Sequence, residues 1–124
     1  MAKKNQSSST REKLFTKLFA CTFCQENLDQ CLKKSPPSSF FGQLIRQLEQ
    51  TDQLISQVAT ERPLSDINKV DLAVLRLIVF EWKQKKTPPK VLINEGVELA
   101  RTFGTENSYR FVNGVLGKII INEI

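Results

Sequence analysis

The stretch VDLAVLRLIVFEW, residues 70–82, is the most apolar part of the chain and decides the fold. Several of its residues are β-branched and would suit a strand, but thirteen residues without a turn signal exceed the ordinary length of a strand. We therefore expect a central helix that is buried on most sides. One short turn, at residues 64–68 after Pro63, is expected to precede it.

Proline and glycine divide the first half of the chain into helical segments. The five prolines occur at only three places, and the five glycines are too few for an all-β protein with many tight turns. We expect a first helix that begins near Arg11 and frays around residues 27–29. A loop at 33–39 separates it from a second stretch that opens at Phe40 and is either one helix or two helices broken near residues 51–52.

Two further helices are expected in the C-terminal part. Thr87-Pro88-Pro89 is typical of a helix start with proline at its first position, and Phe103-Gly104 of a helix end. Thr105 is expected to cap the last helix, which ends near Asn122. The residues of the third helix that we expect in the core are Val91, Leu92, Val97, Leu99, Ala100 and Phe103.

The length of 124 residues and the hydrophobic content of 40% correspond to one domain with a single core. Residues 1–9 are serine-rich and contain Lys3 and Lys4, so we expect a flexible basic tail there and one all-helical domain over 10–124. The first residues lack the apolar run of a signal peptide, and no run approaches the roughly 18 to 20 apolar residues of a membrane span. We expect a cytoplasmic protein without a membrane partner.

The charge balance is basic. Lysine and arginine outnumber the acidic residues by 18 to 13, which gives a net charge of +5 and is compatible with a polyanionic partner. A solvated helix face is the more common meaning of such basic runs. The chain has no histidine, and so it lacks the commonest general base and the commonest metal ligand. We therefore expect no enzymatic activity, no metal site and no cofactor.

Three cysteines, Cys21, Cys24 and Cys31, are clustered and odd in number, so they do not form a complete disulfide framework. A structural zinc site needs a fourth ligand, and a redox Cys-x-x-Cys is expected next to a βαβ unit, which is absent. We interpret the cysteines as small packing residues of a protein from a reducing compartment.

Charged residues within the apolar helices need partners. Arg76 and Glu81 are the only charged residues within 72–82, and Glu95 lies one helix later. An unpaired buried charge costs on the order of 3 to 5 kcal/mol, so we expect Arg76 to meet a carboxylate or the carbonyls of a helix end. Glu95 is assigned a structural role as well. For Glu81 a structural role and contact with a partner both stay open.

Glycine occurs inside the last expected helix, at Asn113-Gly114 and at Gly117 on the same face. A helix-interior glycine costs about 1 kcal/mol relative to alanine, so something is expected to offset it. Close helix packing, which would make Gly114 structural, is the simpler explanation. Close approach of a ligand or an RNA backbone is the alternative.

The C-terminal half carries an ordered series of motifs with fixed gaps. It resembles the NusB family of bacterial transcription antitermination factors, strongly over residues 64–122 and weakly over 11–23. The residues that carry the resemblance are Leu75-Arg76, Phe80-Glu81, Pro88-Pro89-Lys90-Val91, Ile93-Asn94-Glu95-Gly96-Val97-Glu98-Leu99-Ala100, Phe103-Gly104 and Phe111-Val112-Asn113-Gly114-Val115-Leu116.

The resemblance implies an all-α, NusB-like fold of two small helical bundles packed into one domain. It also implies binding partners, which are the small-subunit ribosomal protein that doubles as NusE, single-stranded boxA RNA and the RNA polymerase antitermination complex. The family domain also occurs fused to a ribosomal RNA methyltransferase, but the length of this chain leaves no room for one, so no enzyme is implied.

The resemblance, taken together with the basic runs and the packing arguments above, indicates which residues bind and which are structural. The RNA-binding residues are Lys3, Lys4, Arg11, Lys13, Lys17, Asn113, Gly117 and Lys118, with the N-terminal lysines and arginine contacting phosphates. The surface facing NusE comprises Phe15, Phe19, Phe80, Glu81 and Gln84. Structural roles fall to Arg76, Glu95 and Gly114.

The chain departs from the family pattern at three places. Residues 7–10 are serine and threonine where relatives are arginine-rich, Phe19 stands where a tyrosine is common, and Gly117 stands where an acidic residue is common. Fewer phosphate contacts predict weaker RNA binding with a flatter salt dependence. Two hypotheses follow, namely an RNA-binding antitermination factor, or an adaptor that keeps the NusE-binding face and has little RNA affinity. A homodimer formed through the apolar residues of the first helix is a further alternative.

Overall fold

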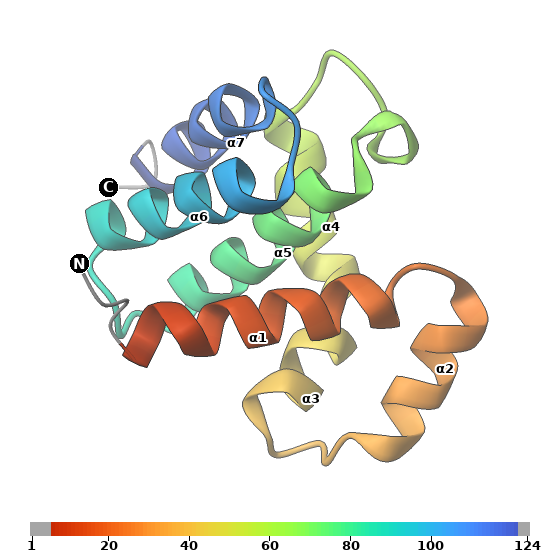
Figure 1. The fold of residues 1–124 in the computed structure, drawn as a ribbon. Helices are drawn as coiled ribbons and strands as arrows, with labels where there is room; N and C mark the ends of the chain where they lie inside the picture. The colour runs from red at the N-terminus through yellow and green to blue at the C-terminus, as the bar shows by residue number, and fades with distance from the viewer. Residues whose placement is uncertain (1–5, 122–124) are drawn as a thin grey trace.

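The apolar stretch at 70–82 folds as helix α5, Lys69–Lys83, as predicted. Asn68 starts the helix because its side-chain Oδ1 accepts a hydrogen bond from the amide of Val70 at 2.8 Å. Ten residues of α5 are buried, and the helix packs against α1, α4, α6 and α7. The central helix is therefore the element around which the others are arranged (Figure 1).

A computed structural model describes residues 6–121. This range consists of helices and the segments that connect them. No strand occurs within this range, so the predicted all-α fold is confirmed. The elements are α1 Gln6–Cys21, α2 Gln25–Lys34, α3 Phe40–Arg46, α4 Leu48–Val58, the 3₁₀ turn η1 Leu64–Asp66, α5 Lys69–Lys83, α6 Pro89–Phe103, α7 Ser108–Leu116 and the π-helical turn η2 Gly117–Ile121.

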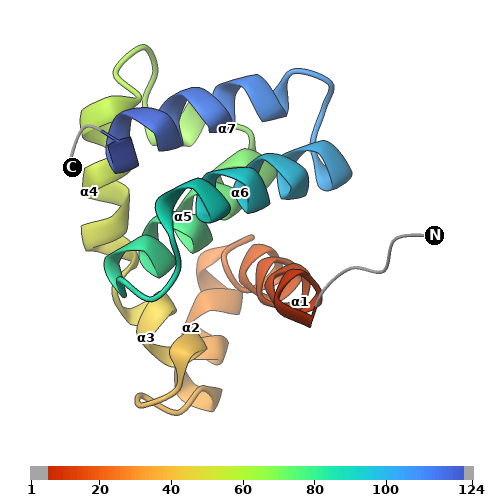
Figure 2. The same ribbon diagram turned by 90° about the vertical axis from the view of Figure 1, so that its left-hand side faces the viewer.

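The helices form two groups, as the predicted pair of small bundles requires. Helices α1, α2 and α3 lie together at one side, and α4, α5, α6 and α7 form the other group (Figures 1 and 2). Packing of α1 on α5 joins the groups, and one continuous core of buried side chains runs through both.

Several predicted boundaries were wrong. Residues 6–9 are the first helical turn of α1 and not a tail, and residues 27–29 lie within α2. The stretch that opens at Phe40 is two helices, and the break falls at Gln47, four residues before the expected place. The last helix starts at Ser108 and not directly after Thr105, although Thr105 accepts a hydrogen bond there from the amide of Asn107.

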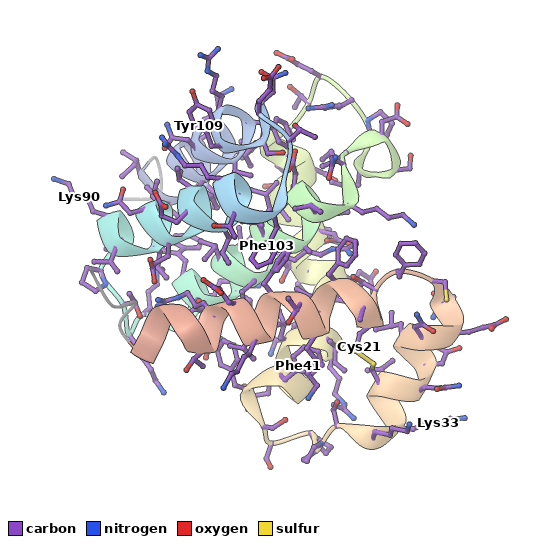
Figure 3. The ribbon with its side chains drawn as sticks, in the orientation of Figure 1. Cys21, Lys33, Phe41, Lys90, Phe103 and Tyr109 are labelled. Carbon is purple, nitrogen blue, oxygen red and sulfur yellow. A yellow bond between two sulfur atoms is a disulfide. The ribbon has the colours of Figure 1, made fainter. Side chains whose placement is uncertain are left out.

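A disulfide links the end of α1 to α2, which the sequence analysis did not predict. Cys21 and Cys31 are joined, with their Cα atoms 6.0 Å apart, and Cys24 is an exposed free thiol (Figure 3). Helix α2 has no fully buried residue, so few apolar contacts hold it against the rest of the chain. The disulfide therefore provides a covalent attachment for the most weakly packed helix.

Helix α6 starts at Pro89 and ends before Gly104, close to the predicted limits. Its close approach to the neighbouring helices requires Gly96, because a Cβ there would lie 2.7 Å from Leu116 and 3.2 Å from Ile78. Two residues expected in the core are exposed instead, Val91 at 44% and Phe103 at 37%.

Candidate functional site

Arg11 connects the two groups of helices through a buried ion-pair cluster. Its Nε lies 2.8 Å from Glu81 Oε2 on α5, and its Nη1 lies 2.9 Å from Glu95 Oε1 on α6. The residue is only 7% exposed, so Arg11, which was expected to contact RNA phosphates, has its guanidinium buried and not at the surface. A buried guanidinium requires such partners because its desolvation is costly.

The guanidinium of Arg11 retains its positive charge in this cluster. Burial lowers the pKa of Arg11, but hydrogen bonding and attraction from Glu81, and then from Glu95, outweigh burial and leave the pKa above its ordinary value. The ion pair of Glu95 with Arg11 is consistent with a structural role for Glu95. The Glu81 side chain is 14% exposed and is held by Arg11, so its carboxylate points at least partly inward.

The other predicted basic residues of α1 are exposed. Lys13 and Lys17 both face solvent, and the ammonium group of Lys17 lies 4.4 Å from the ring centroid of Phe41. Lys3 and Lys4 lie outside the described residues. Two cations of α1 are therefore available for contact with a polyanion.

The aromatic residues predicted to face a partner divide into core and surface. Phe15 and Phe80 are 3% and 0% exposed and belong to the core, so their assignment to an exposed interface was wrong. Phe19 is half-buried, with its ring 6.2 Å from that of Phe15 and 5.9 Å from that of Phe23.

Two exposed rings, which were expected in the core, extend this surface. Phe23 is 54% exposed, and Phe103 projects from the end of α6 to within 4.8 Å of the Phe15 ring (Figure 3). We refer to Phe19, Phe23 and Phe103 as the aromatic surface. Phe23 continues the apolar spacing of Phe15 and Phe19, and this spacing alone cannot show which end of a helical stripe emerges from the core.

Gln84, also predicted to face the partner, is half-buried at the end of α5. Its Nε2 donates a hydrogen bond to the carbonyl oxygen of Phe80 at 3.4 Å. Arg76 meets a carboxylate, as predicted, because its Nε and Nη2 donate to the two carboxylate oxygens of Asp52 at 2.8 Å each. Arg76 therefore has the expected structural role and attaches α5 to α4.

The predicted RNA-binding residues of the last helix are accessible. Asn113 and Lys118 are exposed, and Gly117 is half-buried. A Cβ added at Gly114 or Gly117 would meet nothing within 4 Å, so the expected close packing at Gly114 was wrong. The glycine that permits close packing is Gly96, and no signal in the single sequence distinguishes the two cases.

Basic residues also gather at the connection between α5 and α6, which lies between the start of α1 and the end of η2 (Figure 2). Lys85 adopts the left-handed conformation with φ of 59°, and its ammonium group lies 4.3 Å from the centroid of the Trp82 ring. The exposed lysines here are Lys85 and Lys86 of the connection and Lys90 in the first turn of α6, and Lys90 projects outward (Figure 3). We refer to this part of the molecule as the basic end.

Two kinds of site are not found in the described part of the chain. Residues 6–121 contain no group of three histidine, cysteine or acidic side chains arranged to hold a metal ion. Within the same range, none of the helices has the length and apolar character needed to span a membrane.

Comparison with known proteins gives a consistent result. Residues 8–120 match the model of the NusB family. The chain is 49% identical over 72 residues to the transcription antitermination protein NusB of Roseiflexus castenholzii, a match over 56% of this chain and 51% of the relative. It is 39% identical over 109 residues to the protein of the same name from Psychromonas ingrahamii, covering 85% of this chain and 75% of the relative.

The fold comparison covers almost the whole chain. A solved structure of T. maritima NusB aligns with a TM-score of 0.78 and 32% identity, over 96% of this chain and 93% of that one. The chain spans about half the length of the Roseiflexus relatives that it matches.

Proposed function

The chain belongs to the NusB family, and on this premise we propose that it is a transcription antitermination factor that binds boxA-type single-stranded RNA together with NusE. In this role it acts in the bacterial cytoplasm and helps RNA polymerase to resist termination during transcription of ribosomal RNA operons. The NusB family consists of transcription antitermination factors and not of enzymes, so the proposed action is binding without catalysis.

The observation that carries this proposal is that the family match extends over residues 8–120 and so includes both helical groups. A factor that holds RNA and a protein partner together needs both groups to be present and joined. The buried cluster of Arg11, Glu81 and Glu95 supports this, because it fixes α1 against α5 and α6.

The RNA side of the proposal is supported by exposed cations. Lys13 and Lys17 on α1, the lysines of the basic end, and Lys118 on η2 are accessible to phosphates. Single-stranded RNA is the form expected, since the deep major groove of duplex RNA hides its base edges from side chains. Each phosphate contact by a lysine or arginine adds to the salt dependence of binding.

The protein side is supported by the aromatic surface. Phe23 and Phe103 are large apolar side chains left in contact with water, and aromatic residues are enriched at protein interfaces. NusE is the proposed occupant. A second copy of this chain could occupy the same surface, and binding of NusE would then displace that copy.

A second candidate function is the adaptor that binds NusE but has little affinity for RNA. The burial of Arg11 favours this adaptor function. Arg11 is the one arginine that matches the arginine-rich start of the first helix in relatives, and its guanidinium is already paired with the carboxylates of Glu81 and Glu95. The two candidates share the protein interface and differ only in RNA binding.

An experiment with separate readouts distinguishes them. The purified protein is mixed with the NusE-like ribosomal protein and examined by light scattering, and fluorescence anisotropy then measures binding of labelled boxA RNA by the pair. Formation of a one-to-one pair that binds boxA RNA more tightly than a scrambled RNA supports the antitermination factor. A pair that forms but binds both RNAs equally supports the adaptor, and failure to pair contradicts both candidates.

A further inference from the structure

The Cys21–Cys31 disulfide closes a ring around the connection between α1 and α2 (Figure 3). Cys21 is the last residue of α1 and is 4% exposed, whereas Cys31 lies in the second half of α2 and is half-buried. The sequence separation of the two cysteines is 10, and Phe23 of the aromatic surface lies between them. The cross-link therefore spans the segment that carries one of the rings proposed to contact the protein partner.

Hydrogen bonds also hold α2 near its two ends. At the start, Asn27 Nδ2 donates to the carbonyl oxygen of Ala20 at 3.1 Å. At the other end, Arg46 Nη2 donates to the carbonyl oxygens of Leu32 and Ser35 at 2.8 and 3.1 Å. The charged donor makes the contacts of Arg46 the stronger ones. Arg46 thus provides a pivot at the end of α2, and the disulfide keeps the helix against α1.

A pocket of about 180 Å³ lies beneath the start of α2. Its lining residues come from α2, from the connection that precedes it and from the other helical group, and they are Gln25, Leu28, Thr22, Cys24, Leu48 and Arg76. Open space beneath a helix removes contacts that would otherwise fix it. Every residue of α2 is also at least partly exposed. The start of α2 can therefore change position without disrupting the core.

Phe23 is the residue that such a movement would displace. It is 54% exposed, and its ring lies 5.9 Å from the ring of Phe19. Lys69 of α5 also contacts it, with the ammonium group 4.1 Å from the ring centroid and 3.2 Å from the backbone carbonyl oxygen. Exposed contacts of a flexible lysine constrain the chain little, because water screens them. The ring closed by the disulfide is therefore the firmer constraint on the backbone at Phe23.

We propose that the Cys21–Cys31 disulfide is a redox switch of the aromatic surface, an inference that rests on the proposed binding of a protein partner there. In the oxidised protein the disulfide holds Phe23 beside Phe19, and the surface is ordered before the partner arrives. Reduction by a small thiol of the glutathione class frees the start of α2 and lets Phe23 leave that position. The partner then binds more weakly, because binding must first order the surface.

The exchange proceeds in two steps with a small thiol, RSH, as the reductant. The thiolate of one RSH attacks the sulfur of Cys31, the more accessible of the two cysteines, and forms a mixed disulfide. Cys21 leaves as a thiolate and takes up a proton. A second RSH attacks the mixed disulfide, which releases Cys31 as a thiol and RSSR as the product. Two small thiols are thus oxidised to one disulfide, and the protein disulfide gains two electrons and two protons.

Two observations favour a switch over a permanent cross-link. Cys24 keeps an exposed free thiol close to Cys21 in the sequence, as proteins of a reducing compartment do. Disulfides that form in such a compartment are in most cases transient and serve catalysis or redox sensing. Permanent disulfides compensate for a small core, whereas one continuous core runs through both helical groups here.

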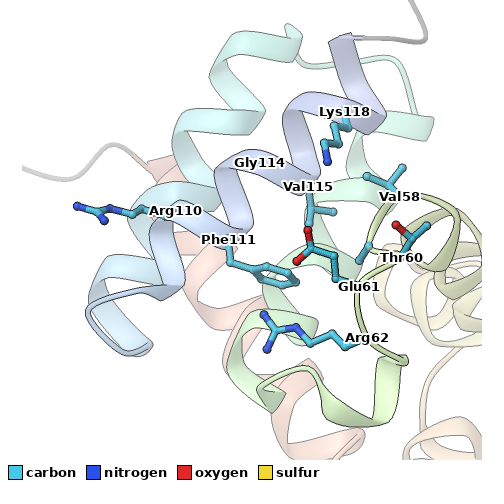
Figure 4. Close-up of a pocket in the computed structure, with 10 residues that line it drawn as sticks. Val58, Thr60, Glu61, Arg62, Arg110, Phe111, Gly114, Val115 and Lys118 are labelled. Atoms are coloured by element: carbon cyan, nitrogen blue, oxygen red, sulfur yellow. The ribbon is translucent and has the colours of Figure 1, made fainter.

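The first test measures whether a small thiol opens the disulfide in the folded protein. The full chain with Cys24→Ser, which keeps the linked pair of cysteines, is incubated with reduced and oxidised glutathione in a series of ratios. Alkylation and mass spectrometry count the free thiols, and hydrogen exchange follows the amides. We expect excess reduced glutathione to open the disulfide and to speed exchange in α2. Helix α7, which lines a separate pocket in the other helical group, is the internal reference and should be unchanged (Figure 4).

The second test measures binding of the NusE-like ribosomal protein to both redox forms by titration calorimetry. Reduction should weaken binding at least about fivefold, since loss of one important interface side chain has an effect of this size or more. Cys31→Ser in the Cys24→Ser background lacks the cross-link. It should bind with the affinity of the reduced protein whether or not a reductant is present.

Phe23→Ala tests whether the effect acts through this ring. The substitution should weaken partner binding to the oxidised protein, and reduction should then cause no further loss. Phe40→Ala is the matched control, because it removes a ring that is 36% exposed on α3 and lies outside the aromatic surface. It should leave the difference between the redox forms intact. A further loss on reduction of Phe23→Ala would overturn the assignment of the switch to the aromatic surface.

The outcomes separate this inference from the proposed function. If the disulfide resists excess reduced glutathione until the protein unfolds, it is a permanent cross-link and the inference is overturned. If both redox forms bind the partner equally well, the inference is again overturned and the proposed function stands. If neither form binds the partner, the proposed function itself fails and the inference fails with it.

Discussion

Arg11 Nε and Glu81 Oε2 are 2.8 Å apart although the two residues are 70 positions apart in the chain. The same guanidinium also reaches Glu95, so one side chain connects α1, α5 and α6. The residue that the family pattern marks for RNA binding thus stabilises the junction between the two helical groups. Any loss of RNA binding in an Arg11 variant must therefore be separated from a loss of folding.

Replacing Arg11 with alanine should destabilise the protein strongly. The substitution leaves the carboxylates of Glu81 and Glu95 partly buried without their cation, and breaking such a pair costs about 3–5 kcal/mol. Urea unfolding measures this loss. Lys13→Ala is the control, because this exposed residue on the same helix should change the unfolding free energy by no more than about 0.5 kcal/mol. Equal effects of the two substitutions would contradict the structural role of Arg11.

Alanine at two helical glycines should have opposite effects. At Gly96 the new methyl group would meet Leu116 and Ile78, and such overpacking costs about 1–3 kcal/mol. At Gly114 the methyl group enters open space, so helix propensity should stabilise the protein by about 1 kcal/mol. Thermal melting of both variants checks the signs, and a stabilised Gly96→Ala variant would show that the helices can separate without cost.

Reducing the disulfide should weaken the attachment of α2. Cys21 and Cys31 close a loop with a sequence separation of 10, for which the chain-entropy relation gives roughly 2–3 kcal/mol. Unfolding with and without a reductant measures the difference. The same loss is expected for Cys31→Ser without reductant, whereas Cys24→Ser, which removes the exposed free thiol, should behave as the wild type. A reductant that leaves the stability unchanged would mean that the disulfide contributes nothing.

Asp71 should give the protein a specific dependence on pH. Burial raises the pKa of this carboxyl group above its ordinary value of 3.8, while the hydrogen bond from Ser108 and the charge of Arg62 act in the opposite direction. Its Oδ1 has no hydrogen-bond partner within the described residues. The folded protein therefore retains this proton to higher pH than the unfolded chain does.

The sign of the effect follows from that difference in proton binding. The stabilisation from protonated Asp71 is fully present below pH 3.8 and is lost as the pH rises through the raised pKa. The unfolding free energy of the wild type, taken relative to Asp71→Asn, should therefore decrease over this acidic range and then become constant. Chemical denaturation at a series of pH values measures it, and a difference that increases with pH would be inconsistent with a raised pKa.

The elements that the sequence predicted well are those with dense apolar patterns. Helix α5 has ten buried residues, and its predicted span agrees closely with the observed one. Helix α2 was missed because it is short and carries few apolar residues, none of which is fully buried. The break at Gln47 was misplaced for a related reason, since both α3 and α4 continue the same apolar spacing across it.

The site residues were harder to predict because their surroundings depend on distant parts of the chain. The partners of Arg11 lie on helices that pack against α1 only in the folded protein, so a single sequence cannot show that Arg11 is buried. Phe80 and Glu81 are adjacent in sequence, yet one is fully buried and the other partly exposed. The signal available in the sequence was that Glu81 and Glu95 are carboxylates in two apolar helices, which indicates that a cation from elsewhere in the chain contacts both.

The measurement that tests the central claim most directly is a titration of labelled boxA RNA with the protein and its NusE-like partner, at 50 and 200 mM salt, against a scrambled RNA of equal length. These salt concentrations span the range over which phosphate contacts strongly change affinity, about 50–200 mM. We expect the pair to prefer boxA RNA at both salt concentrations and its affinity to fall steeply with salt. Equal affinity for the two RNAs, or no binding by the pair, would contradict the assignment of this chain as an RNA-binding antitermination factor.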